Sequence, residues 1–317
     1  MALKLPDRWI WDSWYAKDGD TYHAFYLCAS KGLGNPDRRH RYTSVGHAIS
    51  KDLINWEILP DALAPSDSPA FDSWTTWTGS VVRDDEGKWW MFYTGTSRED
   101  GGDVQRIGAA VSADLNTWSK LSEGALVEAD PRWYELLDKD VWHDQAWRDP
   151  WVFRFPGEAE WQMLVTARLK YGDPKTRGVV GHARSADLQN WEVLEPLSVS
   201  GADFGQMEVL QFEVVDDIPI LLFCCGWREL SEQRVWAFGK RDATYSLVVD
   251  KALSNIDFAK ARAIEDPLVY AGRLVLGPDG VWNLLGFVNM VDGNFIGEIC
   301  DPFPVTADPS LGIISRI

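Results

Sequence analysis

The sequence contains little cysteine, no long apolar run and no excess of basic residues. Its 317 residues include four cysteines, and their spacing matches neither a zinc site nor a disulfide framework. We therefore expect reduced thiols, no bound metal and no other cofactor. No run approaches the length of a membrane span, and residues 1–9 lack the apolar segment of a signal peptide. These features predict a cytoplasmic protein without a membrane partner.

The charge balance narrows the range of partners further. The chain has 31 Lys and Arg against 48 Asp and Glu, which gives a formal net charge of −17. Such a charge argues against nucleic acids and anionic surfaces as partners. The apolar fraction of 45% is enough for a sizeable core, and 18 tryptophans are unusually many. Indole rings suit both packing between sheets and stacking on sugars, so the count alone does not choose between them.

A pattern of 14 residues, G-x-A-x-S-x-D-L-x-x-W-x-x-L, occurs three times, in residues 46–59, 108–121 and 181–194. Its alternation of small, apolar and polar residues predicts a strand, a tight turn at D-L and a second strand. Repetition at such intervals is typical of a repeat architecture. Each copy is expected to form the outer half of a four-stranded propeller blade.

Acidic and glycine-containing turns between alternating apolar runs predict five inner hairpins as well. These hairpins span residues 11–28, 76–95, 147–167, 209–225 and 273–289. The fourth outer half, residues 234–249, is degenerate, and the fifth, around residues 297–305, is short. The sequence therefore predicts one domain over residues 1–317, an all-β five-bladed β-propeller with four antiparallel strands per blade. Within the one long connection, a short helix is expected at residues 131–137.

The hairpins also locate a candidate site. Counting back about eight residues from each turn reaches a position near the start of each first strand: Asp12, Gly79, Asp149, Glu208 and Gly272. First strands are innermost in a propeller, so these positions are expected to form one ring around the axis. Carboxylates crowded in one pocket push their pKa values apart, which creates acid and base roles. Asp12, Asp149 and Glu208 are thus the predicted catalytic residues.

The motifs around these acids resemble those of glycoside hydrolase clan J, which comprises families 32 and 68, the β-fructofuranosidases and levansucrases. Residues 11–14 read W-D-S-W, similar to the nucleophile motif of family 68, and correspond to N-D-P in family 32. Residues 77–80, W-T-G-S, are similar to W-S-G-S, and residues 147–150 contain R-D-P. Glu208 stands at the acid/base position without the Cys or Arg that follows it in these families. Residues 270–271 are similar to the Y-A of family 32.

This resemblance implies a retaining glycosidase that acts on sucrose or fructo-oligosaccharides by hydrolysis or fructosyl transfer. Asp12 would be the nucleophile, and Glu208 would act first as the general acid and then as the general base. Asp149 would hydrogen-bond sugar hydroxyls and stabilise the oxocarbenium-like transition state. The expected partner is therefore a small carbohydrate.

Six further residues are predicted to bind substrate: Trp11, Trp77, Thr78, Arg148, His143 and Tyr270. The tryptophans either form the pocket walls or pack between blades, and His143 either reaches the rim or belongs to a rim loop. The basic run of residues 38–41 follows the first hairpin, where it would form either a phosphate or acidic-sugar subsite or a solvated loop.

Two alternatives accompany this interpretation. The first is an inverting arabinofuranosidase or xylosidase of family 43, because that family shares the same fold. The C-terminal β-sandwich of family 32 has no counterpart in the sequence, which leaves room for a divergent relative. A non-catalytic sugar-binding propeller is the second alternative, because a fold by itself implies no activity.

Overall fold

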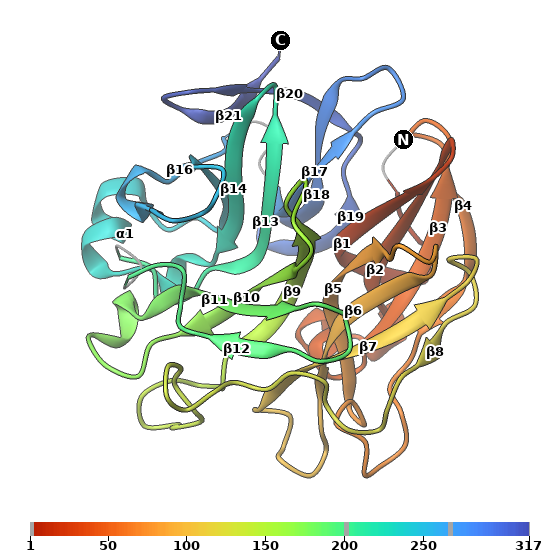
Figure 1. Ribbon diagram of the computed structural model, residues 1–317, viewed down its shortest axis with the longest axis horizontal. Helices are drawn as coiled ribbons and strands as arrows, with labels where there is room; N and C mark the ends of the chain where they lie inside the picture. Colours follow the sequence, from red (N-terminus) through yellow and green to blue (C-terminus); the bar gives the residue numbers. More distant parts are fainter. Residues whose placement is uncertain (1–2, 200–202, 266–268, 317) are drawn as a thin grey trace.

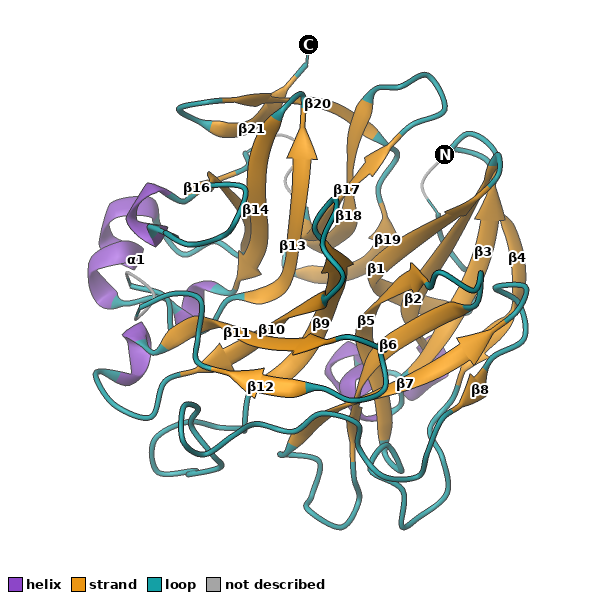
Figure 2. Ribbon diagram, viewed as in Figure 1, coloured by secondary structure: helices purple, strands orange, loops and turns teal. Residues whose placement is uncertain are grey.

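Five antiparallel sheets are arranged around a common axis in the computed structural model, which describes residues 3–199, 203–265 and 269–316 (Figure 1). The predicted fold class is confirmed: the protein is an all-β five-bladed propeller. Helical segments are few and short (Figure 2). None of the helices in the described ranges is long and apolar enough to cross a membrane.

The strands of each blade follow one another in the chain. Blade 1 contains β1 (Arg8–Asp18), β2 (Thr21–Ser30), β3 (Ser44–Ser50) and β4 (Glu57–Leu63). Blade 2 contains β5 (Thr75–Arg83), β6 (Trp89–Thr96), β7 (Gln105–Ser112) and β8 (Ser119–Lys120). Blade 3 contains β9 (Trp147–Arg154), β10 (Trp161–Arg168), β11 (Gly178–Ser185) and β12 (Glu192–Leu194). Blade 4 contains β13 (Glu208–Val215), β14 (Ile218–Cys225), β15 (Ala243–Val248) and β16 (Arg262–Ala263). Blade 5 contains β17 (Tyr270–Leu276), β18 (Trp282–Val291), β19 (Asn294–Ile299), β20 (Phe303–Asp308) and β21 (Gly312–Ser315).

Short helices lie in the connections: η1 (Lys31–Leu33), η2 (Pro36–Arg41), η3 (Pro174–Thr176), η4 (Trp227–Glu229), α1 (Glu232–Phe238) and η5 (Phe258–Lys260).

The first strands of the five blades form the inner wall of the propeller. Strands β1, β5, β9, β13 and β17 contact one another in that order, and β17 contacts β1 to close the ring. Next to this closure, the backbone of Leu3 accepts a hydrogen bond from Ile299 N at 3.0 Å, which links the N-terminal segment to blade 5. Residues near the start of each first strand therefore face a shared space at one end of the axis.

The repeated D-L-x-x-W motif forms the same turn in blades 1, 2 and 3. In blade 3, Leu188 has a left-handed φ of 64°, and Asp187 Oδ1 accepts hydrogen bonds from the amides of Gln189 (2.9 Å) and Asn190 (2.7 Å). Trp191 Nε1 donates to Leu188 O at 3.0 Å, which folds the indole back over the turn. Asp and Asn favour such turns because their side chains bond nearby backbone amides. The predicted outer hairpins are thus confirmed in these three blades.

The tryptophans of this motif pack against neighbouring strands and not against the axis. Trp118 of blade 2 meets Phe25 of blade 1 edge-to-face at 5.6 Å, and Trp191 of blade 3 meets Phe92 of blade 2 at 5.4 Å. Edge-to-face pairs at such distances are favourable beyond the area they bury. The turns of blades 2 and 3 therefore each join their own blade to the preceding one, whereas Trp56 of blade 1 packs against Tyr15 of the same blade.

The helix predicted at residues 131–137 is wrong. The chain makes a turn at residues 131–133 and then continues extended, with Tyr134 in a β-bridge to Leu169. The Tyr134 ring is fully buried against Trp147, 4.7 Å between centroids, and its hydroxyl donates to Leu194 O at 2.7 Å. These tertiary contacts with blade 3 override the local preference for helix.

The outer half of blade 4 departs from the repeat as predicted, because its first part is helical. Helix α1 begins after Ser231, whose Oγ accepts from Arg234 N at 3.1 Å, and the chain returns to the sheet only at β15. The outer half of blade 5 is longer than expected, since β19, β20 and β21 extend over residues 294–315.

Candidate active site

The first strand of every blade carries a β-bulge near the same end of the axis. In β1 the bulge falls between Trp11, which pairs with Leu27, and Ser13, which pairs with Tyr26. Comparable irregularities occur in β5, β9, β13 and β17. The last paired residues before the bulges are Trp11, Trp77, Arg148, Glu208 and Tyr270. The residues that follow them are Asp12, Thr78, Asp149, Val209 and Ala271.

The bulges show that the predicted ring of equivalent positions is partly wrong. Asp12 and Asp149 occupy equivalent positions, but Glu208 lies one residue earlier, at the position equivalent to Arg148. Gly79 lies one residue later than predicted, since Thr78 is the equivalent of Asp12. Gly272 is displaced in the same way, because Ala271 is the equivalent residue in blade 5. Counting from the hairpin turns failed because the turns differ in length and the counting took no account of the bulges.

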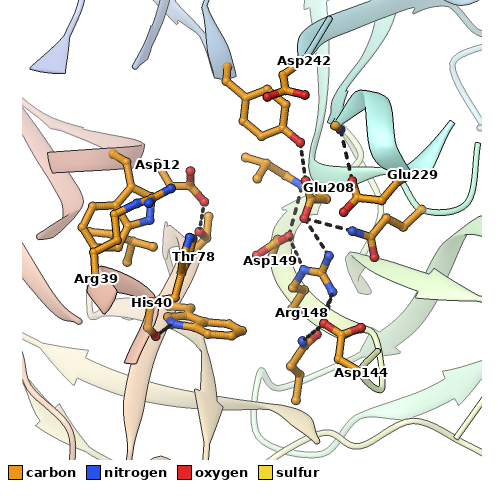
Figure 3. Close-up of a pocket in the computed structure, with 18 of the residues that line it drawn as sticks. Asp12, Arg39, His40, Thr78, Asp144, Arg148, Asp149, Glu208, Glu229 and Asp242 are labelled. Atoms are coloured by element: carbon orange, nitrogen blue, oxygen red, sulfur yellow. Dashed lines mark hydrogen bonds and ion pairs between the residues drawn. The ribbon is translucent and has the colours of Figure 1, made fainter. Parts of the chain in front are cut away.

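One cavity of about 470 Å³ lies at this end of the propeller (Figure 3). All nine residues predicted for the site line it: Trp11, Asp12, Trp77, Thr78, His143, Arg148, Asp149, Glu208 and Tyr270. The bulges explain this convergence, because they turn two successive residues of a first strand toward the same space.

Asp12 lies on the blade 1 side of the cavity with a left-handed φ of 26°. Its Oδ2 accepts a hydrogen bond from the Thr78 hydroxyl at 2.5 Å. Burial raises the pKa of Asp12 to about 6, and the negative charge of Glu208 acts in the same direction. The residue after Thr78 is glycine, and a Cβ there would lie 2.0 Å from Phe92 O, so Gly79 allows β5 to pair closely with β6 at the bulge. No cation lies within ion-pair distance of the Asp12 carboxylate in the described part of the chain.

Asp149 is held from three sides and is only 3% exposed. Its Oδ2 accepts from Thr166 Oγ1 at 3.0 Å and from Val209 N at 3.3 Å, while its own amide donates to Thr94 Oγ1 at 2.8 Å. Burial raises the pKa of Asp149 to about 7, although the nearby Arg148 guanidinium opposes this shift. With Oδ2 occupied, Oδ1 is the oxygen of Asp149 left for a ligand.

Glu208 lies on the opposite side of the cavity in much more polar surroundings (Figure 3). Its Oε1 accepts from Arg148 Nη2 at 2.7 Å and from Gln206 Nε2 at 3.3 Å, and its Oε2 accepts from the Tyr270 hydroxyl. Its side chain is 19% exposed, which leaves it accessible from the cavity. A tyrosine hydroxyl both donates and accepts, so Tyr270 can bond Glu208 in either protonation state.

Arg148 links the acidic groups on this side of the cavity. Its side chain is 7% exposed and lies 3.5 Å from Asp149 Oδ2 and 3.6 Å from Asp144 Oδ2, in addition to its bond with Glu208. Its Nη1 also donates to Gln105 Oε1 at 2.9 Å. Arg148 is therefore a buried connection within the site and not a surface ion pair.

Trp11 and Trp77 form part of the cavity wall and also pack against the segment that contains His40. Both line the cavity, and Trp11 is only 3% exposed. Trp77 Nε1 donates to His40 O at 2.9 Å, and the Trp11 ring meets the His40 ring edge-on at 6.1 Å. His143 is 60% exposed at the rim, 3.6 Å from Asp144.

The basic run of residues 38–41 is part of η2 and contributes to the wall of the cavity. Arg39 is buried, with its guanidinium 3.9 Å from the Phe295 ring centroid. Arg41 donates to Gly102 O at 2.6 Å and to Asp103 Oδ1 at 3.1 Å. Arg39 and Arg41 are thus tied to the body of the propeller, whereas Arg38 and His40 are exposed.

Sequence reasoning missed several polar residues of the cavity. These are Gln105, Gln206, Glu229 and Asp242. Burial, followed by the charge of Glu208, raises the pKa of Glu229 to about 8. Only Gln206, two residues before Glu208, had a position that pointed to the site. The others come from a third strand or from connections, which carry no periodic signal.

Two carboxylates from blades 1 and 4, facing one cavity with unlike surroundings, can act as nucleophile and proton donor toward one bound molecule. No cluster of three His, Cys, Asp or Glu side chains suited to a metal ion occurs in residues 3–199, 203–265 and 269–316.

Solved structures with this fold include several fructoside-active enzymes. The GH32 β-fructofuranosidase of Bombyx mori superposes with a TM-score of 0.72 at 21% identity, covering 99% of this chain and 64% of that one. An inulosucrase from Halalkalicoccus jeotgali bound to kestose gives 0.75 at 21% identity, over 99% of this chain and 90% of the other. The levansucrase of Bacillus subtilis gives 0.71 at 14% identity, over 98% and 87%.

This chain spans between about a quarter and about half of the length of the curated relatives described next. The β-fructofuranosidase isoenzyme CWINV4 of Arabidopsis thaliana is 29% identical over 54% of this chain and 26% of its own length. A sucrose-6-phosphate hydrolase of Klebsiella pneumoniae is 27% identical over 86% of this chain and 54% of its own length. The model of the glycosyl hydrolases family 32 N-terminal domain matches residues 13–295. The resemblance seen in the motifs is thereby confirmed, and the chain belongs to glycosyl hydrolase family 32.

Proposed function

We propose that this protein is a retaining glycosidase that acts on β-fructofuranosides such as sucrose or fructo-oligosaccharides, by hydrolysis or by fructosyl transfer. The observation that carries the proposal is the pairing of Asp12 and Glu208 across one cavity, each in a different environment. Asp12 is buried with a single hydroxyl contact, whereas Glu208 is held by Arg148 and Tyr270. Membership of family 32 supports the same assignment.

In the first step, Asp12 attacks the anomeric carbon of the fructosyl unit, and the bond to the leaving oxygen breaks as Glu208 transfers a proton to that oxygen. A covalent fructosyl ester on Asp12 results. In the second step, Glu208 removes a proton from water or from a sugar hydroxyl, whose oxygen displaces Asp12. Asp149 accepts hydrogen bonds from sugar hydroxyls and stabilises the positive charge of the transition state.

Purified protein incubated with sucrose or kestose should release free fructose or form longer fructosides, as measured by chromatography. Asp12→Asn and Glu208→Gln should each lower kcat by at least about 100-fold, because a nucleophile or proton donor contributes that much or more. Glu57→Gln on the exposed face of β4 is the matched control and should keep its activity.

The melting temperature of both site variants should not fall below that of the parent. A site variant that keeps more than about a tenth of the parent rate would contradict its assigned role. Sugar binding without turnover would instead favour a non-catalytic sugar-binding propeller.

A further inference from the structure

A buried arginine that sequence reasoning did not single out lies beneath the catalytic carboxylates. Arg273 follows the bulge of β17, is 1% exposed and is absent from the lining of the catalytic cavity. Its Nη1 donates to Leu210 O at 2.6 Å and to Val209 O at 3.2 Å, and its guanidinium lies 5.0 Å from the centroid of the Trp151 ring. Arg273 therefore spans from blade 5 to the first strands of blades 4 and 3.

The charge of Arg273 has no direct counter-ion. No carboxylate of the described residues lies within 4.0 Å of it, and its Nε and Nη2 have no hydrogen-bond partner among them. The carboxylates that interact with it electrostatically include Asp149, Asp12 and the buried Glu213. A buried cation without a paired carboxylate is costly, so its main electrostatic benefit must come from these more distant charges.

We propose that Arg273 is a positioning residue that keeps Asp12 ionised for nucleophilic attack and fixes the bulge of β13 next to Glu208. The proposal rests on the proposed function, in which Asp12 is the nucleophile. The two carbonyls that Arg273 binds belong to the residues that directly follow Glu208 in the chain. Its position thus connects the nucleophile in blade 1 with the acid/base in blade 4.

The groups that face Asp12 from each element show why this charge matters. Burial raises the pKa of Asp12 to about 6, Glu208 on β13 adds to the increase, and the Thr78 hydroxyl on β5 lowers the pKa. Asp149 on β9 is a second like charge. Arg273 and, after it, Arg39 are the cations that lower the pKa of Asp12. Removing Arg273 leaves Arg39, which is already engaged with Pro36 O and the Phe295 ring.

The test compares Arg273→Met and Arg273→Lys with the parent protein in the pH profile of kcat/KM on sucrose. The acidic limb reports deprotonation of the site carboxylates in the free enzyme. Arg273 interacts with both Asp149 and Asp12, so the limb should move to higher pH by about one unit in Arg273→Met. Arg273→Lys retains the charge and should show a smaller shift. A purely structural role would lower the amount of folded protein or the rate without moving this limb.

Arg234→Met is the matched control. Arg234 is also buried, donates to a backbone carbonyl, Ala261 O, at 3.0 Å, and lies 4.0 Å from the Phe204 ring centroid, but it belongs to the outer half of blade 4. Its loss should lower the melting temperature without shifting the acidic limb.

A second measurement does not depend on turnover. The titration of the Asp12 carboxyl carbon, followed by ¹³C NMR and assigned with Asp12→Asn, should shift upward in Arg273→Met by the same amount. If the parent turned over no fructoside, the proposed function would fail while this titration still tested the coupling. An unchanged Asp12 titration and an unchanged acidic limb in folded Arg273→Met would overturn the inference.

Discussion

At the scale of single residues, the site is built from side chains held in unfavourable backbone conformations. Asp12 and Asp149 have φ values of 26° and 58°, in a region that residues other than glycine seldom occupy. Such conformations cost on the order of 1 kcal/mol or more and persist only where surrounding contacts enforce them. Here the bulges enforce them, and the result is that two buried carboxylates face one cavity.

The buried charge of Asp149 should make the protein less stable at higher pH. Its pKa of about 7 in the folded protein lies above the value near 4 of an unfolded chain. The stability that its protonated form contributes is complete below about pH 4 and is lost as the pH rises through 7. Asp149→Asn keeps an oxygen that can accept from Thr166 but carries no charge.

We therefore expect Asp149→Asn to melt several degrees above the parent at pH 8 and at nearly the same temperature at pH 4.5, while activity is lost. Thermal unfolding by circular dichroism at both pH values measures the difference. Asp84→Asn serves as control because Asp84 lies in the turn between β5 and β6, away from the cavity, and its pKa is lowered, not raised. A stability gain in Asp149→Asn that was equal at both pH values would contradict a charge effect.

At the scale of elements, the turn that follows the third strand in blades 1, 2 and 3 stabilises the fold without contributing to the site. In blade 2, Asp114 Oδ1 accepts hydrogen bonds from the amides of Asn116 (2.9 Å) and Thr117 (2.8 Å) and from the Ser112 hydroxyl (3.0 Å). This lets Leu115 adopt its φ of 62° and bury its side chain.

Asp114→Ala should lower the free energy of unfolding by about 1 kcal/mol, as is typical for the loss of such a cap. The melting temperature should fall by about 2–4 °C with kcat/KM unchanged at 25 °C. Asp114→Asn, which keeps the accepting oxygen, should lose less. A large loss of kcat/KM at 25 °C in folded Asp114→Ala would show that the turn also shapes the cavity.

The elements that sequence predicted best are those whose local pattern and tertiary role agree. Hairpin turns and the D-L-x-x-W motif are local signals, so they gave the number of blades and most of the strands. The segments at residues 131–137 and 234–249 were harder to predict, because contacts with distant strands or a helix cap decide their conformation.

The β-bulges were the main reason why the sequence did not predict the equivalent positions of the site correctly. Glu208 lies directly before its bulge, whereas Asp12 and Asp149 lie within theirs, and no residue type marks the bulges in the sequence. Family motifs nevertheless identified eight of the nine predicted residues that line the cavity, all except His143, because these motifs lie at the bulges. Residues such as Gln105 and Arg273 were missed, since only the ring of blades brings them close to the acids.

At the scale of the whole molecule, the ring sets the relative position of the two carboxylates that are proposed to react. Asp12 belongs to blade 1 and Glu208 to blade 4, so no local segment determines how they face each other. Their relative position depends on the contacts among first strands and on the closure between β17 and β1. The stereochemical outcome of the proposed reaction should therefore depend on the closed ring.

Retention of configuration is the expected outcome. An inverting enzyme needs a base that activates water on the far side of the sugar, whereas a retaining enzyme needs a fixed carboxylate against the anomeric carbon. Asp12 fits the second role because its short side chain is anchored by Thr78 on a bulged strand. Glu208 has the longer side chain and lies across the cavity, where it can follow the leaving oxygen.

With sucrose as substrate and methanol added, NMR at early times should show methyl β-fructofuranoside and β-fructofuranose before mutarotation. Methanol is trapped in this way only if a fructosyl ester on Asp12 lives long enough to meet it, and attack from the face vacated by the leaving group restores the β configuration. Asp12→Asn should form neither product. A first product of α configuration, with no methyl fructoside, would instead assign Asp12 the role of a base and make the protein an inverting enzyme like those of family 43.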